Sequence, residues 1–149
     1  MVSRRTLLVL IAWVAGGAAA TVLAADHPDF SGTWKMDEAK RPADSQGPRE
    51  VVLTIQHQDP QFDFQAKGRQ SNYAAFSETH SLTTDGKPTM EGKIKVVAEW
   101  QDQALVTRYV IGGEDFMVIE YRLSADGKQL TRDLTVKGNP AGRETYDRQ

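Results

Sequence analysis

The sequence contains no cysteine among its 149 residues. Disulfide bonds, thiolate metal sites and a cysteine-linked lipid anchor are therefore excluded. A fold of this size has to be held together by its apolar core alone. One domain of this length is long enough for that, because it buries roughly two thirds of the surface that the unfolded chain exposes.

The motifs by which common enzymes are recognised are also missing. The sequence has no Gly-x-Ser-x-Gly nucleophile elbow, no phosphate-binding glycine loop and no His-Glu-x-x-His zinc motif. We therefore expect a protein that is not an enzyme and that carries no cofactor and no metal. An enzyme of isomerase or cyclase type is an alternative, because acid–base chemistry from His57 and a nearby carboxylate would leave no sequence motif.

A membrane-spanning helix is not predicted, because the apolar run Leu7–Val14 is too short. It follows two arginines, Arg4 and Arg5, and leads into a small-residue stretch that ends at Ala24. This pattern predicts a signal peptide, residues 1–24, and a periplasmic or secreted protein. Ser3–Leu8 is similar to a twin-arginine export motif, but an ordinary secretory peptide with two arginines is the preferred interpretation.

Positive charge is in slight deficit. The chain has 18 basic and 20 acidic residues; residues 1–24 hold two of the basic ones and no acidic one, so residues 25–149 have 16 and 20, a net charge of −4. Such a surface gives no electrostatic reason to bind nucleic acid or anionic membrane. We expect no nucleic-acid partner, no stable membrane insertion after signal cleavage, and a monomer.

Short alternating segments fill residues 25–149 and predict a single all-β domain. In Val51–Gln58, the side chains of Val51, Leu53 and Ile55 share one face, as in a half-buried strand. Comparable strands are predicted at Gly32–Met36, Phe62–Ala66, Tyr73–Leu82, Lys93–Trp100, Ala104–Ile111, Phe116–Leu123, Gln129–Lys137 and Arg143–Arg148. Consecutive strands at hairpin spacing form an antiparallel meander.

Turn signals separate these strands. Asp85–Pro88 and Gly138–Gly142 are predicted to be turns because they are rich in glycine and proline, and Asp37–Arg49 a loop or at most one helical turn. An open meander would expose two strand edges, whereas closure into a barrel removes them. A sandwich is the alternative, but it needs long connections between sheets that are not visible here. We therefore predict a single up-and-down β-barrel of about 8–10 strands.

Both ends of the domain resemble those of a known superfamily. Phe30–Met36, with its Gly32-x-Trp34 motif, looks like the first strand of lipocalins and fatty-acid-binding proteins, the calycin group. Glu144–Gln149 is similar to the last strand of fatty-acid-binding proteins. The chain thus resembles the exported lipocalin-like proteins of bacteria. The resemblance implies that Trp34 plugs one end of the barrel and that Arg148 or Arg143 covers its ring.

The resemblance does not extend to a fatty-acid ligand. Fatty-acid-binding proteins hold the ligand carboxylate with an Arg-x-Tyr pair on the last strand. Aligning Tyr146 with that tyrosine places Glu144 where the arginine stands, and a glutamate would repel a carboxylate. The helical lid of those proteins has no counterpart in Asp37–Arg49 either.

Arg132 is the first candidate for ligand binding. It shares a strand face with Leu130 and Leu134, and a charge on an apolar face must be paired. It would either anchor a polar group of the ligand, form an internal salt bridge with Glu144, or lie at the barrel rim.

The other candidates are aromatic residues and a histidine on strand faces that we expect to point inward: Tyr109, Tyr121, Trp100, His57 and Tyr146. Aromatic side chains with polar tips suit a ligand cavity, but they equally suit a packed core.

The sequence therefore predicts an exported, lipocalin-like protein that binds a small hydrophobic or amphiphilic molecule inside a β-barrel. An alternative is an interaction or inhibitor barrel that acts through its loops, Asp37–Arg49 and Gly138–Gly142. The cavity enzyme is a third.

Overall fold

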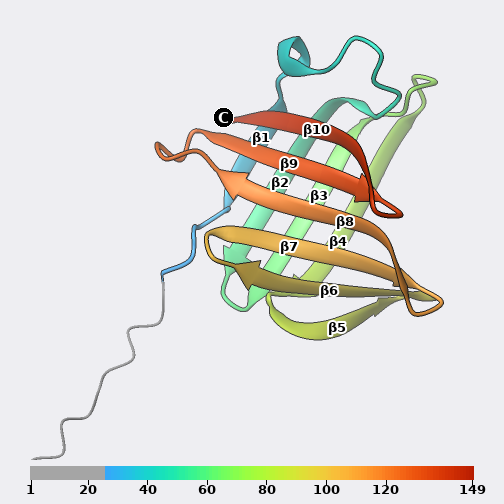
Figure 1. The fold of residues 1–149 in the computed structure, drawn as a ribbon. Coiled ribbons are helices and arrows are strands. Elements are labelled where there is room, and N and C mark those ends of the chain that lie inside the picture. The colour runs from blue at the N-terminus through green and yellow to red at the C-terminus, as the bar shows by residue number, and fades with distance from the viewer. Residues whose placement is uncertain (1–25) are drawn as a thin grey trace, which may run out of the picture.

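The computed structural model describes residues 26–149, so the predicted signal peptide lies outside the described residues. These residues form one antiparallel sheet of ten strands (Figure 1). The strands are β1 (Gly32–Met36), β2 (Arg49–Gln58), β3 (Gln61–Arg69), β4 (Ala75–Thr83), β5 (Asp85–Glu91), β6 (Ile94–Gln101), β7 (Ala104–Ile111), β8 (Glu114–Leu123), β9 (Gln129–Val136) and β10 (Asn139–Arg148).

Helix is almost absent from this part of the chain. A single 3-10 turn, η1 (Glu38–Lys40), follows β1, in agreement with the prediction of at most one helical turn there. No helix within residues 26–149 has the length and apolar character that a membrane crossing requires.

The sheet curls into a nearly closed barrel. Strands that are neighbours in the sequence pair with each other, except β4 and β5, and β1 also pairs with β10, so the spatial order is β4-β3-β2-β1-β10-β9-β8-β7-β6-β5. In Figure 1, β1–β4 lie behind and cross the direction of β6–β10 in front. In the β1–β10 ladder Trp34 lies opposite Arg148 and Met36 opposite Tyr146. The predicted meeting of the first and last strands is confirmed.

Closure is incomplete at one place, a seam between β4 and β5. Within the described residues these two strands share no backbone ladder and are the edges of the sheet. Side chains cross the seam instead: Nδ1 of His80 on β4 lies 2.7 Å from Oε1 of Glu91 on β5.

Two predicted turns are strand in the structure. Asp85–Pro88 belongs to β5, which was missed because glycine and proline normally interrupt strands. Here β5 is an edge strand, where the missing N–H of Pro88 costs no ladder hydrogen bond, and its register with β6 shifts between Asp85 and Pro88.

The second correction concerns Gly138–Gly142. Strand β10 already begins at Asn139, and Pro140 pairs with Thr135 of β9. A register shift between Pro140 and Gly142 accommodates these residues, and Gly142 has a φ of +150° there. Bulges of this kind let a strand continue through residues that look like a loop in the sequence.

The two ends of the barrel differ. The N-terminal segment 26–31 and the turn between β2 and β3 lie at one end, which we call the closed end. The segment 37–48 and the turns β3–β4, β7–β8 and β9–β10 lie at the other, which we call the open end.

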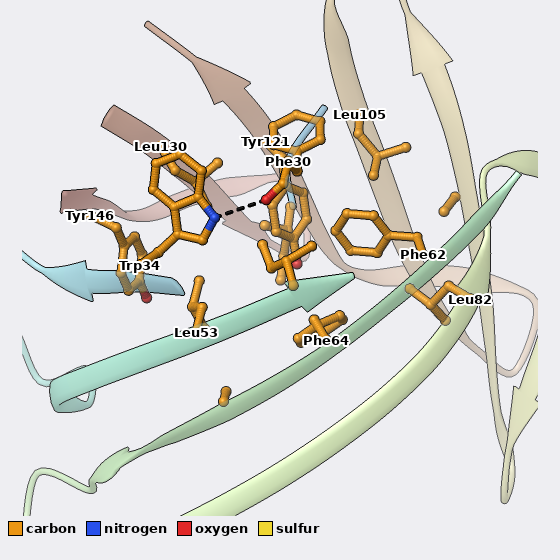
Figure 2. Close-up of a cluster of buried hydrophobic side chains, with 14 of the residues drawn as sticks. Phe30, Trp34, Leu53, Phe62, Phe64, Leu82, Leu105, Tyr121, Leu130 and Tyr146 are labelled. Carbon is orange, nitrogen blue, oxygen red and sulfur yellow. Dashed lines mark hydrogen bonds between the residues drawn. The ribbon is translucent and has the colours of Figure 1, made fainter. Parts of the chain in front are cut away.

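Large apolar side chains fill the closed end (Figure 2). Trp34 is fully buried, and its indole Nε1 donates a hydrogen bond to the backbone oxygen of Phe30 at 2.9 Å. Phe30 stands edge-on to the ring of Phe62, with the ring centroids 6.2 Å apart. The interior of the barrel is therefore a packed core at its closed end.

Candidate functional site

A cavity of about 240 Å³ occupies the interior toward the open end. Its apolar wall comes from β2, β3, β4, β8 and β9 and includes Val51, Phe64, Phe76, Met117, Ile119 and Leu134. Its polar wall is made by Glu78, His80, Tyr109, Arg132 and Glu144. Side chains alternate between the two faces of each strand, and residues directly opposite each other in neighbouring strands share a face. Together these two rules place the lining side chains on the inner face of the barrel.

Arg132 and Glu144 form the main polar feature of this cavity. They lie opposite each other on β9 and β10, and Nη1 of Arg132 is 3.3 Å from Oε2 of Glu144. Only 13% and 15% of the two side chains are exposed. The predicted alternative of an internal salt bridge is therefore present, and its two partners also line the cavity.

Tyr146 completes this pair from the core side. Its hydroxyl donates a hydrogen bond to Oε2 of Glu144 at 2.7 Å and accepts one from Nη1 of Arg132 at 3.4 Å. Burial raises the pKa of the Tyr146 hydroxyl, so it remains a phenol. Burial by itself would lower the pKa of Arg132, but the neighbouring tyrosine oxygens and Glu144 outweigh it and the pKa is raised. Arg132 therefore stays charged.

Two further tyrosines surround Arg132. The guanidinium carbon lies 5.3 Å from the ring centroid of Tyr121, which is fully buried on β8. Burial raises the pKa of both Tyr121 and Tyr109, so both rings carry neutral hydroxyls. Tyr109 lines the cavity, whereas Tyr121 and Tyr146 support Arg132 from behind.

His80 was not predicted as a site residue, yet it faces the cavity. It lies opposite Phe64 in the β3–β4 ladder and stacks on that ring with a centroid separation of 4.7 Å. Its Nδ1 contacts Glu91, and its Nε2 lies 3.6 Å from Glu78. Phe76 and Leu82 share the strand face of His80 and are the sequence signal for this orientation, although Glu78 lies between them on the same face.

The structure places the other two predicted site residues away from the cavity. His57 and Trp100 lie at the closed end, where both contact Asp59. The ring of His27 stacks on that of Trp100 with centroids 4.2 Å apart. The inward orientation predicted for Trp100 and His57 is present, but at the packed half of the interior they seal the barrel and do not line the cavity.

Asp59 organises that sealed end. It accepts hydrogen bonds from His57 Nε2 at 2.9 Å, His27 Nδ1 at 2.8 Å, Thr84 Oγ1 at 2.7 Å and Trp100 Nε1 at 3.1 Å. Partial burial opposes ionisation, but these donors outweigh it and hold the pKa of Asp59 well below its usual value. Within residues 26–149 no group of three or more histidine and carboxylate side chains is placed to hold a metal ion.

The structural trio predicted for closure is present. Arg148, not Arg143, covers Trp34, with its guanidinium carbon 4.2 Å from the ring centroid. Arg143 instead pairs with Asp133. Gly32 suits this position because its φ of +134° is one that other residues rarely adopt; a Cβ there would also lie 2.9 Å from Nη1 of Arg148, which would have to shift.

No protein-family model matches the chain, and no curated protein matches it either. The barrel and its cavity therefore carry the functional inference.

Proposed function

We propose that the protein is an exported, lipocalin-like binding protein that holds a small hydrophobic or amphiphilic molecule in the cavity toward the open end. The observation that carries this proposal is an interior filled only in its closed half, with an apolar wall and one buried polar pair, Arg132 and Glu144, in the other half. Ligand pockets usually combine a mostly apolar lining with a few placed polar groups.

The size of the cavity limits the ligand. At about 240 Å³ it lies just below the range of roughly 300–1,000 Å³ typical of small-molecule sites. A short-chain amphiphile or a single-ring compound suits this volume better than a long lipid.

Ala66 offers a direct test, because its small side chain lines the cavity and is almost fully buried. The change Ala66→Leu adds three carbon atoms to the wall. We expect it to abolish the fluorescence enhancement of an environment-sensitive dye and to remove co-purified small molecules from native mass spectra. Ala125→Leu makes the same change at an exposed position in the β8–β9 turn and should leave both signals intact. Wild-type protein that binds neither dye nor small molecule would contradict the proposal.

Export is part of the same proposal. The predicted cleavage point, after Ala24 or Ala25, immediately precedes a segment that packs on the barrel: His27 contacts both Asp59 and Trp100. Expression of the full chain in a bacterium should therefore give a shortened protein in the periplasm or medium, and N-terminal sequencing should find Ala25 or Asp26 first. Full-length protein retained in the cytoplasm would contradict it.

A second candidate, an interaction barrel that acts through its loops, is favoured by a different observation. The two predicted contact segments meet at the open end, where Pro42, Asp44–Pro48 and Pro140–Glu144 line one groove of about 600 Å³. The exposed large apolar side chains Tyr73, Met90, Ile111 and Phe116 also lie at that end. Binding of a protein partner that is lost in a loop variant but kept in Ala66→Leu would favour this candidate.

A further inference from the structure

Arg132 uses only part of its hydrogen-bonding capacity. Its Nη1 contacts Glu144 and Tyr146, but its Nε is buried without a hydrogen-bond partner in residues 26–149, and no hydrogen bond runs from its Nη2 to another described residue. The Nε–H and one Nη2–H of a guanidinium point in parallel, and this edge is the one that binds pairs of acceptors. A buried donor left unpaired is costly, so this edge is prepared for an acceptor.

Tyr121 provides a second unpaired group beside it. Its hydroxyl is buried without a partner in the described part of the chain, and Tyr121 lies opposite Arg132 in the β8–β9 ladder. Two neighbouring polar groups without partners, next to a cavity that Arg132 lines, point to a ligand with a polar head.

The charges around the cavity decide what kind of head fits. Glu144 already neutralises Arg132, and Glu78 adds a further carboxylate at the cavity wall. An anionic head would place another negative charge next to the largely buried Glu144, whereas an uncharged acceptor takes the free guanidinium edge without that repulsion.

Resting on the proposed function, we infer that the cavity selects an uncharged amphiphile whose head carries a carbonyl-type acceptor, such as an amide, ester or ketone, and rejects a carboxylate of the same shape. Arg132 donates from Nε and Nη2 to that acceptor, and the apolar wall around Phe64 and Met117 receives the chain.

Octanamide and octanoate test this selectivity, because they share chain length and number of non-hydrogen atoms. Each is titrated by calorimetry into the protein lacking residues 1–24 at about pH 8, where octanoate is fully ionised. We expect octanamide to bind at least about tenfold more tightly, since like charges brought together in a binding site are strongly disfavoured. Equal or tighter binding of octanoate would overturn the inference.

Two variants assign the effect to residues. Glu144→Gln leaves Arg132 without its counter-ion, so octanoate affinity should rise about tenfold while octanamide affinity changes little. Glu114→Gln is the control, because Glu114 is exposed on β8 and does not line the cavity, so solvent screens its charge from the ligand. An unchanged ratio of the two ligands in Glu144→Gln would contradict the assigned role of Glu144.

Arg132→Lys separates ligand recognition from simple charge balance. A lysine keeps the positive charge opposite Glu144 but lacks the paired donors of the guanidinium edge. Octanamide affinity should fall about tenfold; if it does not, water satisfies Arg132 and the inference is wrong.

Binding of the environment-sensitive dye distinguishes failure of the inferred head-group selectivity from failure of the proposed binding function. If the dye binds but neither octanoyl compound displaces it, the inferred head-group selectivity falls and the proposed cavity function stands. If the dye does not bind either, the proposed function falls with it.

Discussion

The guanidinium of Arg148 lies over the indole ring of Trp34, 4.2 Å from its centroid, and fastens the last strand to the first. Its Nη1 also donates to the backbone oxygen of Ser31 at 2.6 Å, and its Nε to that of Gly127 at 2.9 Å. One side chain therefore connects the N-terminal segment, the β8–β9 turn and the closing ladder.

Replacing this side chain should weaken the whole barrel. We expect Arg148→Ala to lower the free energy of unfolding by about 2–3 kcal/mol, since it removes a cation–π contact and two hydrogen bonds from a charged donor. Arg122→Ala is the control, because Arg122 is exposed and its ion pair is with the partly exposed Glu120; it should change stability by less than about 0.5 kcal/mol. Urea unfolding followed by tryptophan fluorescence measures the free energy of unfolding of both variants. Equal losses would show that the contact between Arg148 and Trp34 does not stabilise the barrel.

Gly68 is a point of close approach between β3 and β2. A Cβ at this position would lie 2.8 Å from the backbone oxygen of Arg49 and 3.0 Å from a ring carbon of Phe76. We expect Gly68→Ala to destabilise the protein by about 1–3 kcal/mol, because backbone on one side cannot move away easily. Gly47→Ala has no contact closer than 3.5 Å and should be nearly neutral in the same thermal unfolding measurement.

Because Asp59 accepts several hydrogen bonds as a carboxylate, we expect the stability of the fold to depend on pH. The folded-state pKa of Asp59 is lowered, so the unfolded chain takes up a proton first as the pH falls. Its stabilisation is therefore complete above about pH 4, the usual aspartate range, and is lost as the pH drops toward the folded-state value.

Asp59→Asn tests this. At neutral pH the variant should be less stable by about 1–2 kcal/mol, because the hydrogen bonds to a charged acceptor from His27, His57 and Trp100 weaken. The difference should shrink below about pH 4 in urea unfolding experiments. Asp102→Asn, at an exposed turn position, should show no such convergence. A stability difference that stays constant down to pH 2 would contradict the low pKa.

Replacing tyrosine by phenylalanine should affect the free energy of unfolding differently at two buried positions, Tyr121 and Tyr146. The Tyr121 hydroxyl has no partner within the described residues, so Tyr121→Phe should leave the free energy of unfolding unchanged or raise it by up to about 1 kcal/mol. The Tyr146 hydroxyl donates to Glu144, so Tyr146→Phe should lower it by about 1–2 kcal/mol. Thermal unfolding without added ligand compares the two directly, and a reversed order would disprove the hydrogen-bond assignments.

Much of the fold was predictable from the sequence. The alternation in Val51–Gln58 fixes which face is buried, and Val51, Leu53 and Ile55 are indeed almost fully buried. The pairing of β1 with β10 and the position of Arg148 over Trp34 agree with the prediction made from Gly32-x-Trp34 and the last strand. Strand β5 was missed because an edge strand tolerates the proline that would interrupt a central one.

The cavity was less predictable. Alternation tells which side chains face inward, but not at which height along the barrel the interior is filled. Alternation therefore predicts the same role for Trp100 and Arg132, although the first seals the closed end and the second lines the cavity. His80 was missed although Phe76 and Leu82 share its strand face, because two polar residues, Glu78 and His80 itself, interrupt that apolar face.

The seam between β4 and β5 falls in the middle of the chain. The first and last strands of the chain, β1 and β10, are instead joined by a backbone ladder. A circular permutant that links Gln149 to the N-terminal segment and begins at Asp85 would therefore keep every backbone ladder of the barrel. The break in the sheet therefore lies where the chain is continuous, between β4 and β5, and the ends of the chain lie where the sheet is continuous, almost half-way round the barrel.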